Sequence, residues 1–113
     1  MKKLEPDSKI NLKDFILDVL DTTKAYDVEV IDLFGKTDIA NYMIIASGNS
    51  DRQIKAIADQ LTDKLKECDF EFTVEGMENK DWVLVDTYDV IVHLFKEGTR
   101  SEYDLESLWS LKK

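Results

Sequence analysis

Cysteine, proline, histidine and long apolar runs are all scarce in this sequence. Because Cys68 is the only cysteine, an internal disulfide is excluded and a reducing compartment is the simpler expectation. No run approaches the roughly eighteen apolar residues that a membrane-spanning helix needs. Residues 5–7, which are Glu, Pro and Asp, stand where a signal peptide would continue with an apolar stretch. The sequence therefore predicts a cytoplasmic protein that neither spans a membrane nor is exported.

Basic residues are few relative to acidic ones. The 24 Asp and Glu residues against 15 Lys and Arg residues give a formal charge of -9 at pH 7, which repels phosphate backbones. Direct nucleic-acid binding is therefore not expected. An acidic surface suits a basic protein partner, although acidity also serves solubility alone.

No tract rich in glycine, serine or proline divides the chain, which has only four glycines and one proline. Hydrophobic residues make up 43% of the 113 residues, enough for one modest core. We therefore predict a single domain over residues 11–113, preceded by a polar and flexible N-terminus at residues 1–10.

Apolar residues at helical spacing predict helices in three places. The first helix is expected to run from its cap at Asn11 to about Lys24. The longest one follows Ser50, which forms a capping-box pattern with Gln53. Its apolar stripe consists of Ile54, Ile57, Ala58, Leu61 and Leu65. Residues 101–108 predict a short closing helix.

Strands are predicted at residues 28–34, 42–46, 70–74, 82–86 and 90–95. Residues 47–50 are expected to break the second strand, and residues 86–89 to form a tight turn that joins the last two strands as a hairpin. The order of helices and strands predicts an α/β fold, in which helices pack on a mixed β-sheet of about five strands.

Two segments imitate phosphate-binding motifs. Gly35, Lys36 and Thr37 resemble the end of a phosphate-binding loop, but Val30 stands at the earlier glycine position and no helix follows. Residues 47–50 lie at a strand-to-helix junction, where backbone amides can hold an anion, yet a capping serine explains that segment as well. We interpret the first segment as a turn and the second as a helix cap.

Candidate catalytic and metal-binding residues are also sparse. His93 is the only histidine, and no further ligands stand at a recognisable spacing from it, so a structural or interface histidine is expected. Asp86 and Asp89 flank the predicted turn, where aspartate commonly accepts hydrogen bonds from nearby amides. The sequence therefore predicts no catalytic residue, no metal and no cofactor.

Five segments carry a more specific resemblance. They are K-T-D-I-A-N-Y-M-I-I-A-S-G at residues 36–48, R-Q-I-K-A-I-A at 52–58, W-V-L-V-D at 82–86, D-V-I-V-H-L-F at 89–95 and R-S-E-Y-D-L-E-S-L-W at 100–109. In this order they resemble the ribosomal silencing factor family, the RsfS or Iojap-like proteins, over roughly residues 12–110. Tyr88 departs from the pattern, because the family usually has glycine in that turn. Gly98 and Glu102 also depart, replacing a common glutamate and a frequent aromatic residue.

The resemblance implies a binding protein rather than an enzyme. Members of the family bind the large ribosomal subunit through its ribosomal protein number fourteen and sterically block joining with the small subunit. This represses translation, and members also accompany large-subunit biogenesis. The implied topology is similar to that of nucleotidyltransferases, without their catalytic motif. Whether the free protein is a monomer or a homodimer stays open.

A docking surface of this kind needs aromatic anchors and complementary charge. Strand alternation places Trp82, Leu84 and Asp86 on one side of their strand, although a tryptophan in a strand can also belong to the core. With the resemblance, the predicted partner-binding residues are Asp38, Tyr42, Trp82, Leu84, Asp86, Tyr88, Asp89, His93, Arg100 and Tyr103.

The alternative function is that of a small metal-dependent nucleotidyltransferase. Such an enzyme holds magnesium with two acids placed two residues apart on a strand, beside a Gly-Ser turn. Asp27 and Glu29 have this spacing, but no Gly-Ser turn precedes them. Calorimetric titration with magnesium and nucleoside triphosphates separates the two functions, since binding with turnover would favour the enzyme.

Overall fold

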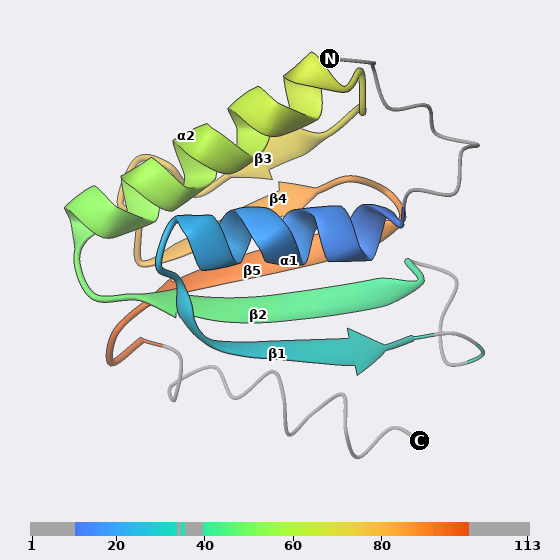
Figure 1. Ribbon diagram of the computed structural model, residues 1–113. Coiled ribbons are helices and arrows are strands. Elements are labelled where there is room, and N and C mark those ends of the chain that lie inside the picture. Colours follow the sequence, from blue (N-terminus) through green and yellow to red (C-terminus); the bar gives the residue numbers. More distant parts are fainter. Residues whose placement is uncertain (1–10, 34, 36–39, 100–113) are drawn as a thin grey trace.

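The computed structural model describes residues 11–33, 35 and 40–99, which form a five-stranded sheet and two helices. The elements, in chain order, are α1 (Leu12–Thr22), β1 (Tyr26–Asp32), β2 (Tyr42–Gly48), α2 (Asp51–Glu67), β3 (Thr73–Glu75), β4 (Trp82–Asp86) and β5 (Val90–Lys96). The strand order in the sheet is β1-β2-β5-β4-β3. The β2–β5 pair is parallel and the other pairs are antiparallel. Helices α1 and α2 lie on the same face of the sheet (Figure 1), and the predicted α/β fold with a mixed sheet is confirmed.

Both helices begin at the residues that the sequence predicts. The Asn11 side chain accepts hydrogen bonds from the backbone amides of Lys13 and Asp14, at 2.9 and 3.3 Å. Helix α1 ends at Thr22, earlier than predicted, because Lys24 has a φ of +70° and cannot continue a right-handed helix.

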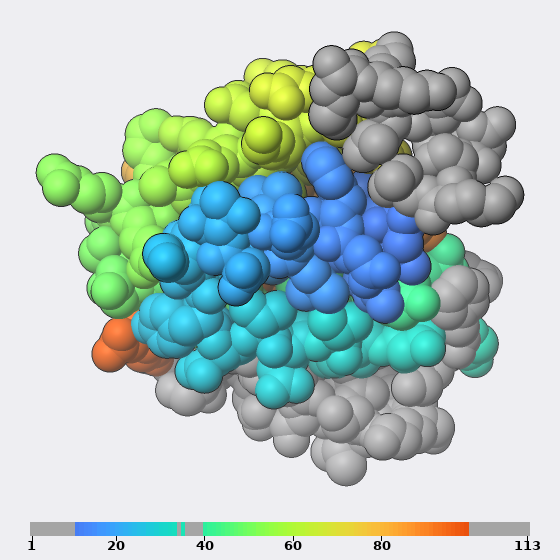
Figure 2. Space-filling model, in the orientation of Figure 1, coloured from blue at the N-terminus to red at the C-terminus, as the bar shows by residue number. Residues whose placement is uncertain are grey.

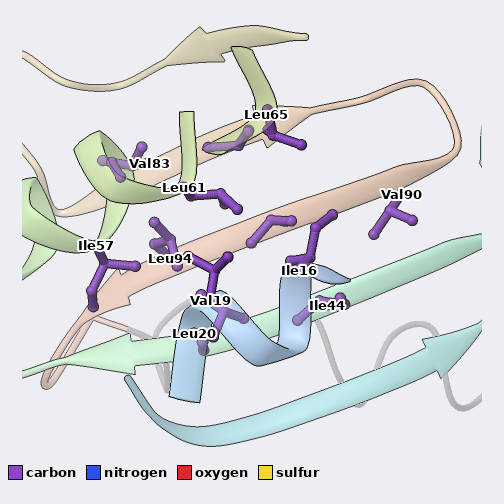
Figure 3. Close-up of a cluster of buried hydrophobic side chains, with 14 of the residues drawn as sticks. Ile16, Val19, Leu20, Ile44, Ile57, Leu61, Leu65, Val83, Val90 and Leu94 are labelled. Carbon is purple, nitrogen blue, oxygen red and sulfur yellow. The ribbon is translucent and has the colours of Figure 1, made fainter. Parts of the chain in front are cut away.

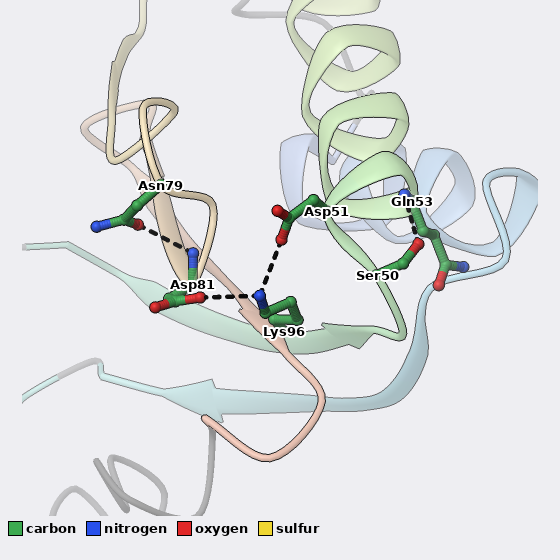
Figure 4. Close-up of polar contacts among 6 residues, drawn as sticks. All are labelled: Ser50, Asp51, Gln53, Asn79, Asp81 and Lys96. Carbon is green, nitrogen blue, oxygen red and sulfur yellow. Dashed lines mark hydrogen bonds and ion pairs between the residues drawn. The ribbon is translucent and has the colours of Figure 1, made fainter.

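The capping box of α2 is also present. The Ser50 hydroxyl accepts a hydrogen bond from the Gln53 amide at 3.1 Å (Figure 4). The reciprocal bond reaches one residue further back than the usual pattern, because the Gln53 side-chain oxygen accepts from the backbone amide of Asn49 at 2.6 Å. The bond to Ser50 satisfies one of the amides that the first turn of the helix leaves without partners.

Two strand boundaries differ from the prediction. Strand β2 continues to Gly48 instead of breaking after residue 46, because Ser47 and Gly48 pair with Phe95 and Lys96 in the parallel ladder. Strand β3 begins only at Thr73, since the chain before it still completes the end of α2, where the Phe70 amide donates to the Leu65 carbonyl. The predicted closing helix and the N-terminal ten residues lie outside the described part of the chain.

The main core lies between the two helices and the sheet. The whole apolar stripe predicted for α2 is buried there. Ile57, Leu61 and Leu65 of this stripe are labelled in Figure 3. Figure 2 shows the side chains of α1 and α2 covering this face of the sheet. The further buried members of the core are Ile16, Val19 and Leu20 from α1 and Ile44, Ala46, Val83, Val85, Val90, Val92 and Leu94 from the sheet.

A polar cluster joins three elements at the end of β5. The Lys96 ammonium group lies 2.9 Å from Asp51 at the start of α2 and 3.2 Å from Asp81, just before β4 (Figure 4). The hydrogen bond to Asp51, followed by the one to Asp81, raises the pKa of Lys96 above its ordinary value. Because this ammonium group is exposed to solvent, the pairs contribute little to the free energy of folding.

Candidate docking surface

The face of the sheet opposite α1 and α2 carries a second apolar cluster, here called the second face. Its members are Leu33, Ala40, Met43, Ile45, Ile91 and Phe95, with Ile31, Trp82 and Leu84 packed against them. Alternation along β4 explains why its residues divide between the two faces of the sheet, because Val83 and Val85 lie in the core under the helices. The prediction that Trp82, Leu84 and Asp86 share one side of β4 is therefore confirmed, and that side faces away from both helices.

Three aromatic rings meet on the second face, where β4 begins and β5 approaches its end. The register pairs Trp82 with Phe95 and Leu84 with His93. The rings of Trp82 and Phe95 are stacked, with centroids 5.2 Å apart, and those of His93 and Phe95 are stacked at 6.2 Å. Trp82 and Leu84 are partly exposed, whereas His93 and Phe95 are buried. The partly exposed indole ring of Trp82 therefore lies against the buried ring of Phe95.

A hydrogen bond between side chains fixes the orientation of the indole. Trp82 Nε1–H donates to His93 Nδ1 at 2.9 Å. Because Nδ1 accepts this bond, the proton of the neutral imidazole is assigned to Nε2. Burial lowers the pKa of the His93 imidazole from 6.5 to about 4, which keeps it neutral at physiological pH.

The lowered pKa of His93 predicts a specific acid sensitivity. Below pH 6.5 the unfolded chain binds a proton at this histidine and the folded chain does not, so stability falls as the pH drops towards 4. Between pH 7 and pH 5, we expect the unfolding free energy of the parent to fall by about 2 kcal/mol more than that of His93→Asn, because the variant has no imidazole.

Urea unfolding at the two pH values measures this change. Every other side chain is the same in both proteins, so the difference between them reports on His93. A constant difference between parent and variant would contradict the lowered pKa of His93.

The hairpin turn between β4 and β5 uses its polar side chains locally. The Asp86 carboxylate accepts a hydrogen bond from the Tyr88 amide at 2.8 Å, and Asp89 accepts one from the Asn41 side-chain amide. Thr87 exchanges two hydrogen bonds with the Val90 backbone. The two aspartates therefore bond amides, as predicted for turn residues. Tyr88 is 57% exposed and has a φ of +73°. This backbone conformation suits the glycine that the family usually has at this turn.

Tyr42 does not join the aromatic cluster. It lies at the start of β2 and packs against the main core on the helix side, with the Lys13 ammonium group 5.0 Å from the centre of its ring. The predicted site residues that lie outside the described part of the chain are Asp38, Arg100 and Tyr103. Of the ten predicted residues, the structure thus brings Trp82, Leu84 and His93 into direct proximity, with Asp86 further along the same side of β4.

The predicted site residues leave out most of the apolar members of the second face, among them Met43, Ile45 and Phe95. The signal was present, because residues 42–46 are apolar at successive positions. A continuous apolar strand is typical of burial on both faces of a sheet. That pattern therefore predicts a second apolar face in addition to the helix-covered one.

The described residues contain no group of three or more His, Cys, Asp or Glu side chains placed to hold a metal ion. Asp27 and Glu29, which have the spacing of a nucleotidyltransferase pair, lie in edge strand β1 at a register irregularity. Asp27 itself has a φ of +51°. Within the described ranges, neither helix is long and apolar enough to cross a membrane.

Comparison with known proteins identifies the family. The model of the family described as "Ribosomal silencing factor during starvation" matches residues 6–113. The chain belongs to the ribosomal silencing factor family. Ribosomal silencing factor RsfS from Zymomonas mobilis is 44% identical to it over 95 residues, covering 83% of this chain and 71% of that protein.

More distant relatives and solved structures agree with this family. A crystal structure of a Chromobacterium violaceum protein superimposes with a TM-score of 0.84 at 37% identity, covering 88% of this chain and 83% of that one. The Mus musculus protein named "Mitochondrial assembly of ribosomal large subunit protein 1" is 32% identical over 103 residues, covering 88% of this chain and 45% of the mouse protein. The predicted membership of the ribosomal silencing factor family is confirmed.

Proposed function

We propose that this chain binds the large ribosomal subunit through its ribosomal protein number fourteen and sterically prevents joining with the small subunit, which represses translation. The observation that carries the proposal is the Trp82 cluster on the sheet face opposite both helices. Family membership supports the silencing role, and the name of the mouse relative supports an additional part in large-subunit biogenesis.

The second face has the composition of a protein-docking site. It carries a partly buried tryptophan and leucine, and in interface hot spots an aromatic anchor of this kind fills a pocket of the partner. The ladder pairings place Glu29, Glu75 and Asp86 on the same face around them. These carboxylates and the net charge of -9 suit a basic partner, and proteins of the ribosome must be basic where they contact RNA.

The proposal assigns a binding role, and no catalytic step, to the chain. It places the protein in the cytoplasm, where ribosomal subunits join, and treats residues 11–113 as one functional domain. Residues Asp38, Tyr88, Asp89, Arg100 and Tyr103 remain proposed contributors to binding, and so does Tyr42, which lies on the helix side of the sheet. Light scattering on the free protein, after size-exclusion chromatography, decides between a monomer and a homodimer.

Sucrose-gradient sedimentation tests the proposed function. The purified protein is expected to sediment with free large subunits and to be depleted from joined ribosomes, because a blocking ligand and the small subunit compete for one surface. Adding the protein to separated subunits should reduce the yield of joined ribosomes in proportion to its occupancy. Recovery mainly with small subunits would contradict the proposal.

The charge of the second face predicts salt-dependent association. Electrostatic steering weakens as the Debye length falls from about 10 Å at 0.1 M salt to about 3 Å at 1 M. We expect the association rate to decrease with rising salt, and we expect Glu75→Gln to make this dependence shallower. The measurement is stopped-flow or surface-based association kinetics with the isolated ribosomal protein.

Asp63→Asn provides a matched control, because Asp63 is an exposed residue of α2 and its replacement removes the same charge. It should leave the salt dependence close to that of the parent, since it lies on the helix side. Equal effects of both variants would mean that net charge alone controls the rate, and that the second face has no special role.

A further inference from the structure

We propose that His93 has two roles on the second face, holding the indole of Trp82 through Nδ1 and offering its Nε2–H to an oxygen acceptor of the docked protein. This inference rests on the proposed function and deepens it, because it identifies a polar contact among the apolar residues of that surface.

The positioning role follows from the direction of the hydrogen bond. An indole nitrogen is a donor only, so the 2.9 Å contact requires His93 Nδ1 to be the acceptor. A protonated imidazole has no acceptor and could not make this bond. The burial that keeps the imidazole neutral therefore also keeps the indole in place over Phe95.

The second role follows from the remaining nitrogen. With the proton on Nε2, the imidazole carries a donor for which the described part of the chain shows no acceptor. The residue is only 6% exposed, yet no described side-chain nitrogen or oxygen is both fully buried and unpaired. Nε2 therefore retains a narrow opening to the surface.

The apolar surroundings of His93 determine which groups of a partner suit the Nε2–H donor. Its neighbours across the two flanking strands are Ile45 on β2 and Leu84 on β4, which offer no hydrogen-bonding side chain. A nearly buried N–H in an apolar row is unfavourable unless it has an acceptor. A carbonyl or carboxylate oxygen of a docked protein satisfies it, and a partner with an apolar group at that point is disfavoured.

A purely structural histidine is the alternative, and two amide variants separate it from the proposal. In His93→Asn the side-chain oxygen can occupy the position of Nδ1, so the variant keeps an acceptor for the indole and loses the distal donor. In His93→Gln the amide lies near the position of Nε2, so the variant keeps the distal donor and loses the indole acceptor. If His93 is purely structural, the two variants should not differ in this way.

Nuclear magnetic resonance of the free protein tests the positioning role. The indole signal of Trp82 is identified by its loss in Trp82→Phe, and its exchange with solvent is measured in each protein. Slow exchange is expected in the parent and in His93→Asn, with at least about tenfold faster exchange in His93→Gln. Equal exchange rates in all three proteins would overturn the positioning role.

The parent protein alone provides a second test of the tautomer, which does not depend on whether any variant folds. Long-range proton–nitrogen spectra of the imidazole are expected to show a protonated Nε2 and an unprotonated Nδ1 at pH 7. Finding the proton on Nδ1 would overturn both roles, because that nitrogen could then not accept the indole bond.

Binding to purified large subunits tests the donor role. His93→Asn is expected to bind about tenfold more weakly than the parent, as for the loss of one hydrogen bond, although its indole remains protected. Parent-like affinity of this variant would overturn the donor role. If the parent itself fails to bind large subunits, the proposed function and the donor role both fail, whereas the exchange measurement still decides the positioning role.

Discussion

Replacement of Trp82 by alanine is expected to weaken binding to the isolated ribosomal protein by at least about thirtyfold, or roughly 2 kcal/mol. The indole is partly exposed on the second face, stacked on the buried ring of Phe95 and held by a hydrogen bond to His93. Anchors of this kind lose little conformational freedom on binding, since their orientation is already set before the partner arrives. Titration calorimetry of parent and variant measures the effect.

Val83→Ala is the matched control for this prediction. Val83 is the next residue of β4 and is fully buried on the opposite side, under the helices. Its truncation should lower the unfolding free energy by about 1 to 3 kcal/mol and leave affinity nearly unchanged, provided that the folded fraction is equal. Trp82→Ala should instead weaken binding and leave the unfolding free energy nearly unchanged. If Trp82→Ala unfolds far more easily than Val83→Ala, or binds like the parent, Trp82 is a core residue or makes no contact with the partner.

Local sequence signals predicted the elements that position this site. The Asn11 and Ser50 caps fix where the two helices begin, and alternation along β4 fixes which residues share a side with Trp82. Both depend on interactions between residues that are close in the chain. For this reason they could be derived before the structure was known.

Properties that depend on distant residues could not be derived in the same way. Alternation does not reveal which side the helices cover, because either face of β4 could have packed on α1 and α2. The extension of β2 to Gly48 depends on its pairing with Lys96, nearly fifty residues later in the chain. The bond between Trp82 and His93 requires the register of the β4–β5 hairpin and the choice of side-chain rotamers, neither of which the periodicity of a strand specifies.

Gly76→Ala is expected to lower the unfolding free energy by roughly 3 to 5 kcal/mol. Gly76 follows β3 directly and has a φ of +91°, a conformation that costs about 1 to 3 kcal/mol for residues with a side chain. A Cβ atom at this position would also lie 2.2 Å from the carbonyl oxygen of Trp82. The β3–β4 connection or the start of β4 must therefore shift, and forced shifts of packed groups typically cost about 1 to 3 kcal/mol more.

Gly98→Ala separates these two contributions. Gly98 has nearly the same φ, at +92°, but an added Cβ would meet no atom of the described residues within 4 Å. Its replacement is expected to cost only about 1 to 2 kcal/mol, from backbone strain alone. Chemical denaturation of both variants gives the difference, and the indole signal of Trp82 should move in Gly76→Ala and stay in place in Gly98→Ala. Equal destabilisation by the two substitutions would show that the close approach of Gly76 to Trp82 is unimportant, and that β4 is not held in position by that contact.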